Sequence, residues 1–253
     1  MPSHFSIIGF ALESQEQLVT LARRASGAAE PIRCGARRYL RWRGGSGEEL
    51  WLQVDEGGDL LGMNPHFSGK SALRVGLTRH VRRDGDTALD GAFHGWVEPE
   101  GADPSSGAYP IVFDCPDFGV PARLKLPAVV TVQIAAFAHD LTVHASAAAH
   151  AASQAGQEGK LASRSFIPSG LFGPDMARVE PPEAFAILTG HVLESAAKEN
   201  AVTGSPFHWA LVDTYGGVYD VVIDPRIAPE LPRAGSVISG TFWLSGRVVA
   251  YPN

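Results

Sequence analysis

The chain ends in a long alternating segment, residues 236–249, whose one face is apolar and whose other face is mostly polar. This alternation is typical of a β-strand that buries one side. The same pattern occurs earlier, because residues 126–145 align without a gap to residues 231–250 and match Phe137 to Phe242. We therefore predict a duplicated β-module, which constrains the fold more than any other feature of the sequence.

The composition indicates a globular protein that is rich in sheet. Of the 253 residues, 45% are apolar and 19% are charged, which excludes wholesale disorder. The 28 glycines and 18 prolines separate short runs of β-branched and aromatic residues, a pattern that favours sheets over a helical bundle. No apolar run is long enough to span a bilayer, and residues 1–5 do not begin a secretory signal. Cys34 and Cys115 lack metal-site spacing, so we expect plain thiols and a cytoplasmic protein.

The charge is distributed unevenly along the chain. The net charge is −6, but residues 1–83 contain 12 Lys or Arg against 8 Asp or Glu, which gives +4. Residues 84–253 hold the other 9 basic and 19 acidic residues, which gives −10. An acidic surface repels phosphates, so we expect no binding to nucleic acid.

Residues 1–83 are predicted to form an N-terminal α+β unit. Residues 5–12 form a short apolar run that suits a buried strand. Ser14 is placed to cap an amphipathic helix that ends at Gly27. The strands expected after this helix cover residues 32–43, 49–54 and 60–63, with residues 64–67 as a loop. The expected order of elements is β-α-β-β-β.

Over residues 4–68 this order is similar to one module of the vicinal-oxygen-chelate (glyoxalase-like) proteins. The resemblance implies a metal-binding histidine on the first strand and a glutamate or histidine on a later strand. His4 stands just before the first expected strand, and Glu49 or Gln53 would have to complete the site. No second histidine falls at a matching place, so we do not assign the chain to this family. We expect no metal and no cofactor.

The remainder is predicted to hold two related β-modules, each of which could close as a small, partly open barrel. Module A spans residues 84–145, a connector rich in Gly, Ser and Pro spans 146–178, and module B spans 179–253. A further strand is expected at 71–82, at the end of the N-terminal unit, and a short alanine-rich helix is expected at 145–155. In module A the expected strands are 92–97, 109–114 and 129–143. In module B, residues 187–192 are matched to the strand at Gly95 and residues 219–224 to residues 109–114, with an extra strand at 207–212.

Several frequent catalytic signatures are absent from the sequence. It contains no G-x-G-x-x-G after a strand, no G-x-x-x-x-G-K-[ST], no H-E-x-x-H and no paired C-x-x-C. No serine stands in a G-x-S-x-G turn. The sequence therefore gives no motif for nucleotide binding, zinc peptidase or serine hydrolase chemistry.

An arginine-rich strand is the first candidate binding surface. Arg37, Tyr39, Arg41 and Arg43 share one face of the strand expected at 32–43. Guanidinium groups bind phosphates and carboxylates through two parallel hydrogen bonds and stack on aromatic rings. This face could hold an anionic ligand. The alternative is a solvated sheet face paired with the carboxylates of Glu48, Glu49 and Asp55 on the following strand and turn.

A second candidate surface lies on the last strand, where Trp243 and Arg247 share the polar face. Exposed tryptophan and arginine are the residue types that anchor protein interfaces. If another part of the chain covers this face, Trp243 belongs to the core instead.

Histidines and strand-end aspartates are the candidates for catalysis. His94 and His191 take related places in the two modules, and Asp114 and Asp224 each end a matched strand. Histidines on strands are more often hydrogen-bonded fillers, and strand-end aspartates usually cap turns. No three histidines have the spacing of a metal site.

We expect a cytoplasmic, non-catalytic binding or accessory protein that holds a partner protein or a small anionic ligand, with no membrane contact. The residues expected to bind are Arg37, Tyr39, Arg41, Arg43, Trp243 and Arg247. The alternative is an enzyme, with or without a metal ion, whose site lies in a cleft between the N-terminal unit and module A. Its candidate residues are His66, His80, His94 and Asp114.

Overall fold

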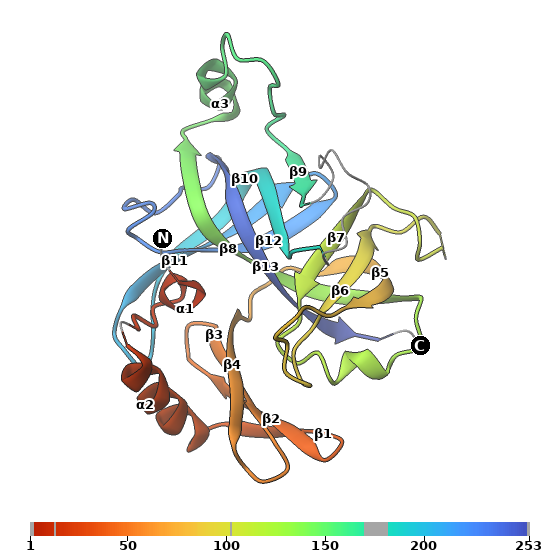
Figure 1. Ribbon diagram of the computed structural model, residues 1–253. Helices are drawn as coiled ribbons and strands as arrows, with labels where there is room; N and C mark the ends of the chain where they lie inside the picture. Colours follow the sequence, from red (N-terminus) through yellow and green to blue (C-terminus); the bar gives the residue numbers. More distant parts are fainter. Residues whose placement is uncertain (1–2, 13, 102, 170–181, 252–253) are drawn as a thin grey trace.

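The chain forms a four-stranded sheet and a nine-stranded sheet, with two short helices before them (Figure 1). The structure is a computed structural model, and it describes residues 3–12, 14–101, 103–169 and 182–251. The expectation of a sheet-rich α+β protein is confirmed. In the described residues, no helix has both the length and the apolar content that a membrane crossing requires.

The chain begins with two helices, α1 (His4–Ile7) and α2 (Gln15–Ser26). Ser14 caps α2 as predicted, because its hydroxyl accepts a hydrogen bond of 3.2 Å from the N–H of Gln17. The prediction of a strand over residues 5–12 is wrong. Ile7, Ile8 and Phe10 are all buried, and such a short apolar run does not distinguish a buried helical turn from a buried strand.

The small sheet has the order β1-β2-β3-β4 and is antiparallel throughout. Two sequence predictions are wrong here. Residues 32–43 form a hairpin that turns at Gly35, whose φ of +66° favours glycine, and residues 64–67 continue the last strand. The observed order α-α-β-β-β-β is not the one on which the resemblance to the vicinal-oxygen-chelate proteins depended. The strands are β1 (Glu30–Cys34), β2 (Arg37–Arg43), β3 (Glu48–Val54) and β4 (Leu60–Phe67).

The large sheet contains every strand predicted after residue 70. Its first half consists of β5 (Leu73–Val81), β6 (Ala92–Val97), β7 (Tyr109–Asp114) and β8 (Ala128–His144), with the 3-10 turn η1 (Pro121–Arg123) before β8. The short helix α3 (Ala147–Ser153) and β9 (Ser165–Pro168) follow. Its second half consists of β10 (Phe185–Glu199), β11 (Pro206–Thr214), β12 (Gly217–Ile223) and β13 (Val237–Ala250).

The paired strands of the large sheet form two closed rings. Both rings contain the long antiparallel pair β8 and β13. The meander β5-β6-β7 connects β8 to β13, and β7 runs parallel to β13. The meander β10-β11-β12 connects β13 to β8, and β12 runs parallel to β8.

In their places within the two rings, β10 corresponds to β5 and β11 corresponds to β6. The predicted match of residues 187–192 to the strand at Gly95, with an extra strand inserted, does not agree with this pairing. The unit boundaries at residues 83, 145 and 178 stay a prediction.

Two large apolar layers hold the described part of the molecule together, and a small third cluster contains Tyr39, Trp51 and Leu89. One layer fills the interior of the large sheet, and the other lies between that sheet, the small sheet and the helices. Alternate residues of β8 belong to different layers: Ile134 and Ala136 face the interior, whereas Ala135 and Phe137 face the N-terminal elements. The small sheet is therefore covered on both sides, and every residue of β3 is buried.

Candidate functional site

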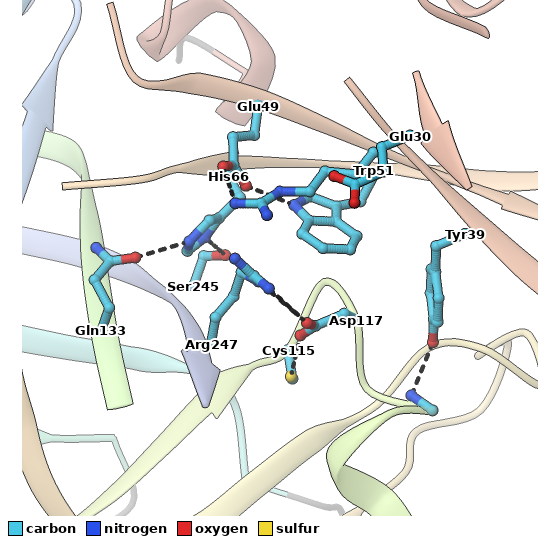
Figure 2. A network of polar contacts seen from close by, with 12 residues as sticks. Glu30, Tyr39, Glu49, Trp51, His66, Cys115, Asp117, Gln133, Ser245 and Arg247 are labelled. Atoms are coloured by element: carbon cyan, nitrogen blue, oxygen red, sulfur yellow. Dashed lines mark hydrogen bonds and ion pairs between the residues drawn. The ribbon is translucent and has the colours of Figure 1, made fainter. Parts of the chain in front are cut away.

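The face of the small sheet that meets the large sheet is polar, which is unusual for an internal interface (Figure 2). Because neighbours along a strand alternate between faces, Tyr39 and Arg41 of β2 lie on the same side as Glu49 and Trp51 of β3. Side chains of the large sheet and of the loop after β7 meet them there. The network drawn in Figure 2 includes Tyr39, Glu49, Trp51, His66, Cys115, Asp117, Gln133, Ser245 and Arg247.

Glu49 is fully buried and holds two donors. One Oε atom accepts a 2.5 Å ion-paired hydrogen bond from Arg41, and the other accepts a 2.9 Å hydrogen bond from the Trp51 indole. Burial opposes ionisation, but nearby His66, Arg41 and Arg247 outweigh it, so the pKa of Glu49 is lowered. The charge pairing of the alternative prediction is therefore confirmed for Arg41 and Glu49, but its solvated sheet face is wrong, because the large sheet covers this face.

A second ion pair, between Arg247 and Asp117, lies close to the first (Figure 2). Arg247 donates to Asp117 Oδ2 from Nε at 3.1 Å and from Nη2 at 3.0 Å. The guanidinium carbon of Arg247 lies 4.5 Å from the Trp51 ring centroid, and that of Arg41 lies 5.0 Å from it. Trp51 thus links the two ion pairs, whose two positive and two negative charges cancel.

His66 connects β4 to both halves of the large sheet. Its Nε2 is 2.9 Å from Gln133 Oε1, and its Nδ1 is 2.8 Å from the Ser245 hydroxyl oxygen. The Gln133 amide also donates to Asp220 at 2.9 Å, which leaves its oxygen as the acceptor toward His66. His66 therefore carries its proton on Nε2 and accepts the hydroxyl proton of Ser245. Full burial lowers the pKa of His66 to about 4, although Glu49 opposes the shift, so the ring is neutral at pH 7.

A serine hydroxyl that donates to a neutral imidazole can serve as an activated nucleophile. Here Ser245 is 1% exposed and His66 is 0% exposed, so no substrate reaches either side chain. With its charges cancelled, the network holds the small sheet against the large one, although the buried Nε of Arg41 has no hydrogen-bond partner.

The other candidates for catalysis do not meet His66 in the structure. The His80 ring packs edge-on against Phe93 at 5.3 Å, and His94 Nδ1 is 2.7 Å from the Thr78 hydroxyl. Asp114 pairs with Arg83 at 2.6 Å and accepts a 2.6 Å hydrogen bond from the Trp243 indole. No three His, Cys, Asp or Glu side chains converge as a metal site within the described part of the chain.

Most of the predicted binding residues lie inside the molecule. Trp243 is 7% exposed and stacks on His4, with ring centroids 3.9 Å apart, so the alternative that places it in the core is confirmed. Tyr39 is fully buried, and its hydroxyl donates to the Leu89 carbonyl at 2.7 Å. Arg37 and Arg43 are exposed. A role of these residues in binding a partner stays a prediction.

Two hollows open to solvent. One of about 370 Å³ lies between α1, β4 and β13, and His4, Asn64 and Trp243 are part of its wall. The other, of about 290 Å³, lies between α2 and the small sheet. Its lining includes the apolar side chains of Val19, Ala22, Leu40, Val54 and Leu60 and the two basic residues Arg23 and Arg38.

Arg23 and Arg38 differ from the buried arginines because neither forms an ion pair with any residue that the structure describes. Arg38 belongs to the predicted arginine-rich strand, but it lies on the face opposite to Arg37, Tyr39, Arg41 and Arg43. Sequence reasoning missed Arg23 as a site residue, since a basic residue in the last turn of a helix is also an ordinary helix-end signal.

Comparison with known proteins assigns no family: no family model matches the chain, and no curated protein matches it significantly.

Proposed function

We propose that this protein is a non-catalytic binding protein, and that it holds an anionic ligand with an apolar part in the groove between α2 and the small sheet. The observation that carries the proposal is that Arg23 and Arg38 both line an apolar hollow, and that neither has a carboxylate partner among the described residues. A carboxylate or phosphate is the group that guanidinium side chains bind best.

The walls of the groove favour a ligand that also has apolar surface. Val19 and Ala22 of α2 face Leu40 of β2 across the hollow. Leu60, which also lines the hollow, is 44% exposed. Covering such side chains stabilises a complex by about 25 cal/mol per Å² of apolar area removed from water. An amphipathic anion would therefore gain from both parts of the groove.

The surrounding charges leave the two arginines available. The turn beside the groove carries Asp55, Glu56 and Asp59, and none of these described carboxylates forms an ion pair with Arg23 or Arg38. The Asp55 carboxylate instead accepts hydrogen bonds from the N–H groups of Gly58 and Asp59, each at 2.8 Å. Residues 1–83 carry a net charge of +4, whereas the whole chain carries −6. This part of the protein attracts anions, while the chain as a whole does not favour nucleic acid.

The test is binding of octanoate, followed by calorimetry and by the NMR signals of the arginine side chains. Arg38→Gln and Arg23→Gln should each weaken binding about tenfold, the effect of losing one charge-assisted hydrogen bond of about 1.5 kcal/mol. Arg33→Gln is the matched control, because Arg33 is exposed on β1 and does not line the groove. Octanol should bind more weakly than octanoate.

A peptide that ends in a leucine carboxylate is the second probe, because a free acid and a protein C-terminus share the same chemistry. Binding of octanoate alone would identify a small-molecule ligand, and tighter binding of the peptide would identify a protein partner. Equal losses in Arg33→Gln and Arg38→Gln, or no binding of either probe, would refute the groove as the site.

The duplicated architecture is also part of the proposal. It is supported by the identical pairing schemes around β8 and β13, and by Tyr109 and Tyr219, which the repeat matches and whose hydroxyls lie 2.7 Å apart. Residues related by a two-fold axis contact each other where they lie close to it. Superposition of residues 73–144 on residues 185–250 in a crystal structure is the test. Unlike chain paths would contradict duplication.

We propose a cytoplasmic location because Cys34 and Cys115 are both free thiols, which suits a reducing compartment. Cell fractionation checks this, and recovery of the protein outside the cytoplasm would refute it.

A further inference from the structure

The helix α3 stands at one end of the large sheet, directly after β8 (Figure 1). Its sequence is almost entirely alanine, and His150 is its one buried residue, at 4% exposure. The alanine side chains bury little area and form no polar contacts with the sheet. Docking of α3 therefore depends on a single titratable ring.

Two further histidines lie beneath this ring. His144 of β8 and His191 of β10 both pair with Val237 of β13, from opposite sides. Residues paired across strands project from the same face of a sheet, so the two histidines lie on one face. Because β13 lies between their strands, their backbones are about 10 Å apart. His150 packs edge-on against His144, with ring centroids 5.0 Å apart. Three imidazoles thus gather where α3 meets the sheet.

The remaining contacts at this end of the sheet do not supply a negative charge to the cluster. His191 Nε2 is 3.1 Å from the Ser163 hydroxyl, and the His150 ring lies 3.3 Å from the uncharged Gln154 amide nitrogen. Asp213 of β11 pairs with His191 in register, but its carboxylate forms a 2.7 Å ion pair with Arg164. A charged His150 would therefore be buried beside other histidines without a compensating carboxylate.

We propose that α3 is an acid-sensitive latch, which leaves the sheet when the buried His150 takes up a proton. The reason is that a neutral His150 can be buried against His144, whereas charged rings repel one another and resist burial. Burial, followed by the neighbouring His144 and His191, lowers the pKa of His150. By linkage, docking is favoured above the ordinary histidine pKa of about 6.5 and weakens as the pH falls below it.

The test is amide hydrogen exchange of α3 in the full-length protein at about pH 7.5 and about pH 5, corrected for the intrinsic exchange rates. The opening of α3 should rise by up to about thirtyfold, which is the full effect of one proton over the roughly 1.5 pH units between 6.5 and 5. His150→Phe keeps an aromatic ring but cannot be charged, so its α3 should open equally at both pH values. His80→Phe is the control, because His80 packs on Phe93 away from α3 and its loss should leave the pH response intact.

A pH-independent opening in the unaltered protein, or the same pH response in His150→Phe, would overturn the latch. If His150→Phe does not dock α3 at all, titration of the His150 ring by NMR in the unaltered protein decides. A midpoint below 6.5 supports the latch, and a midpoint at or above 6.5 contradicts it.

Discussion

The neutral, fully buried His66 predicts a specific dependence of stability on pH. The perturbation is a fall in pH from about 7 to about 4, applied to the unaltered protein and to His66→Gln. In the folded state the pKa of His66 is lowered from 6.5 to about 4. Between these values the unfolded chain binds a proton at this position and the folded protein does not. The free energy of unfolding therefore falls as the pH falls through this window, and the His66 contribution levels off below about pH 4.

The size of this effect follows from the same shift. One pKa unit corresponds to about 1.4 kcal/mol, so His66 should account for about 3 kcal/mol of lost stability between pH 6.5 and pH 4. Urea unfolding followed by tryptophan fluorescence measures the free energy at each pH. His66→Gln should be less stable at pH 7 because it loses the hydrogen bonds to Ser245 and Gln133, yet its pH dependence should be smaller by about 3 kcal/mol. Parallel pH profiles for the two proteins would refute a neutral, buried His66.

Two further substitutions probe the packing that positions the network. Asp117→Asn leaves the mostly buried Arg247 without its carboxylate, so the free energy of unfolding should fall by about 3 kcal/mol. The same urea unfolding measures this loss. A loss below about 0.5 kcal/mol would contradict the role of this ion pair. Gly240→Ala places a methyl group against the backbone carbonyl of Asp140 on the neighbouring strand, so the free energy of unfolding should fall by about 1–3 kcal/mol. Gly45→Ala is the control, because its methyl group meets no atom within 4 Å and should leave the stability nearly unchanged. Equal melting temperatures for these two glycine variants would refute the close approach of β8 and β13.

The strands after residue 70 could be predicted because their two-residue alternation is regular and their ends carry turn residues. The long segments 126–145 and 231–250 illustrate this, since β8 and β13 appear at the expected places. That these two strands pair with each other could not be predicted, because local patterns contain no information on which strands become neighbours. The closure of the sheet around them depends on that pairing.

The polar interface illustrates a second limit. Arg41 and His66 lie on strands whose polar residues alternate with apolar ones, and an alternating strand normally exposes its polar face. Here that face is covered by the large sheet, and His66 meets Ser245 across 179 residues of sequence. The expectation that Tyr39 and Trp243 form a surface followed from the usual pattern, and tertiary packing overrode it.

The most direct test of the proposed function is a titration of the labelled protein with octanoate, observed at the Nε–Hε signals of its arginines. We expect saturable shifts at Arg23 and Arg38, and no shifts at the buried Arg41 and Arg247, whose guanidinium groups are already paired. Shifts spread evenly over all exposed arginines, or no saturable shift at Arg38, would contradict a binding site between α2 and the small sheet.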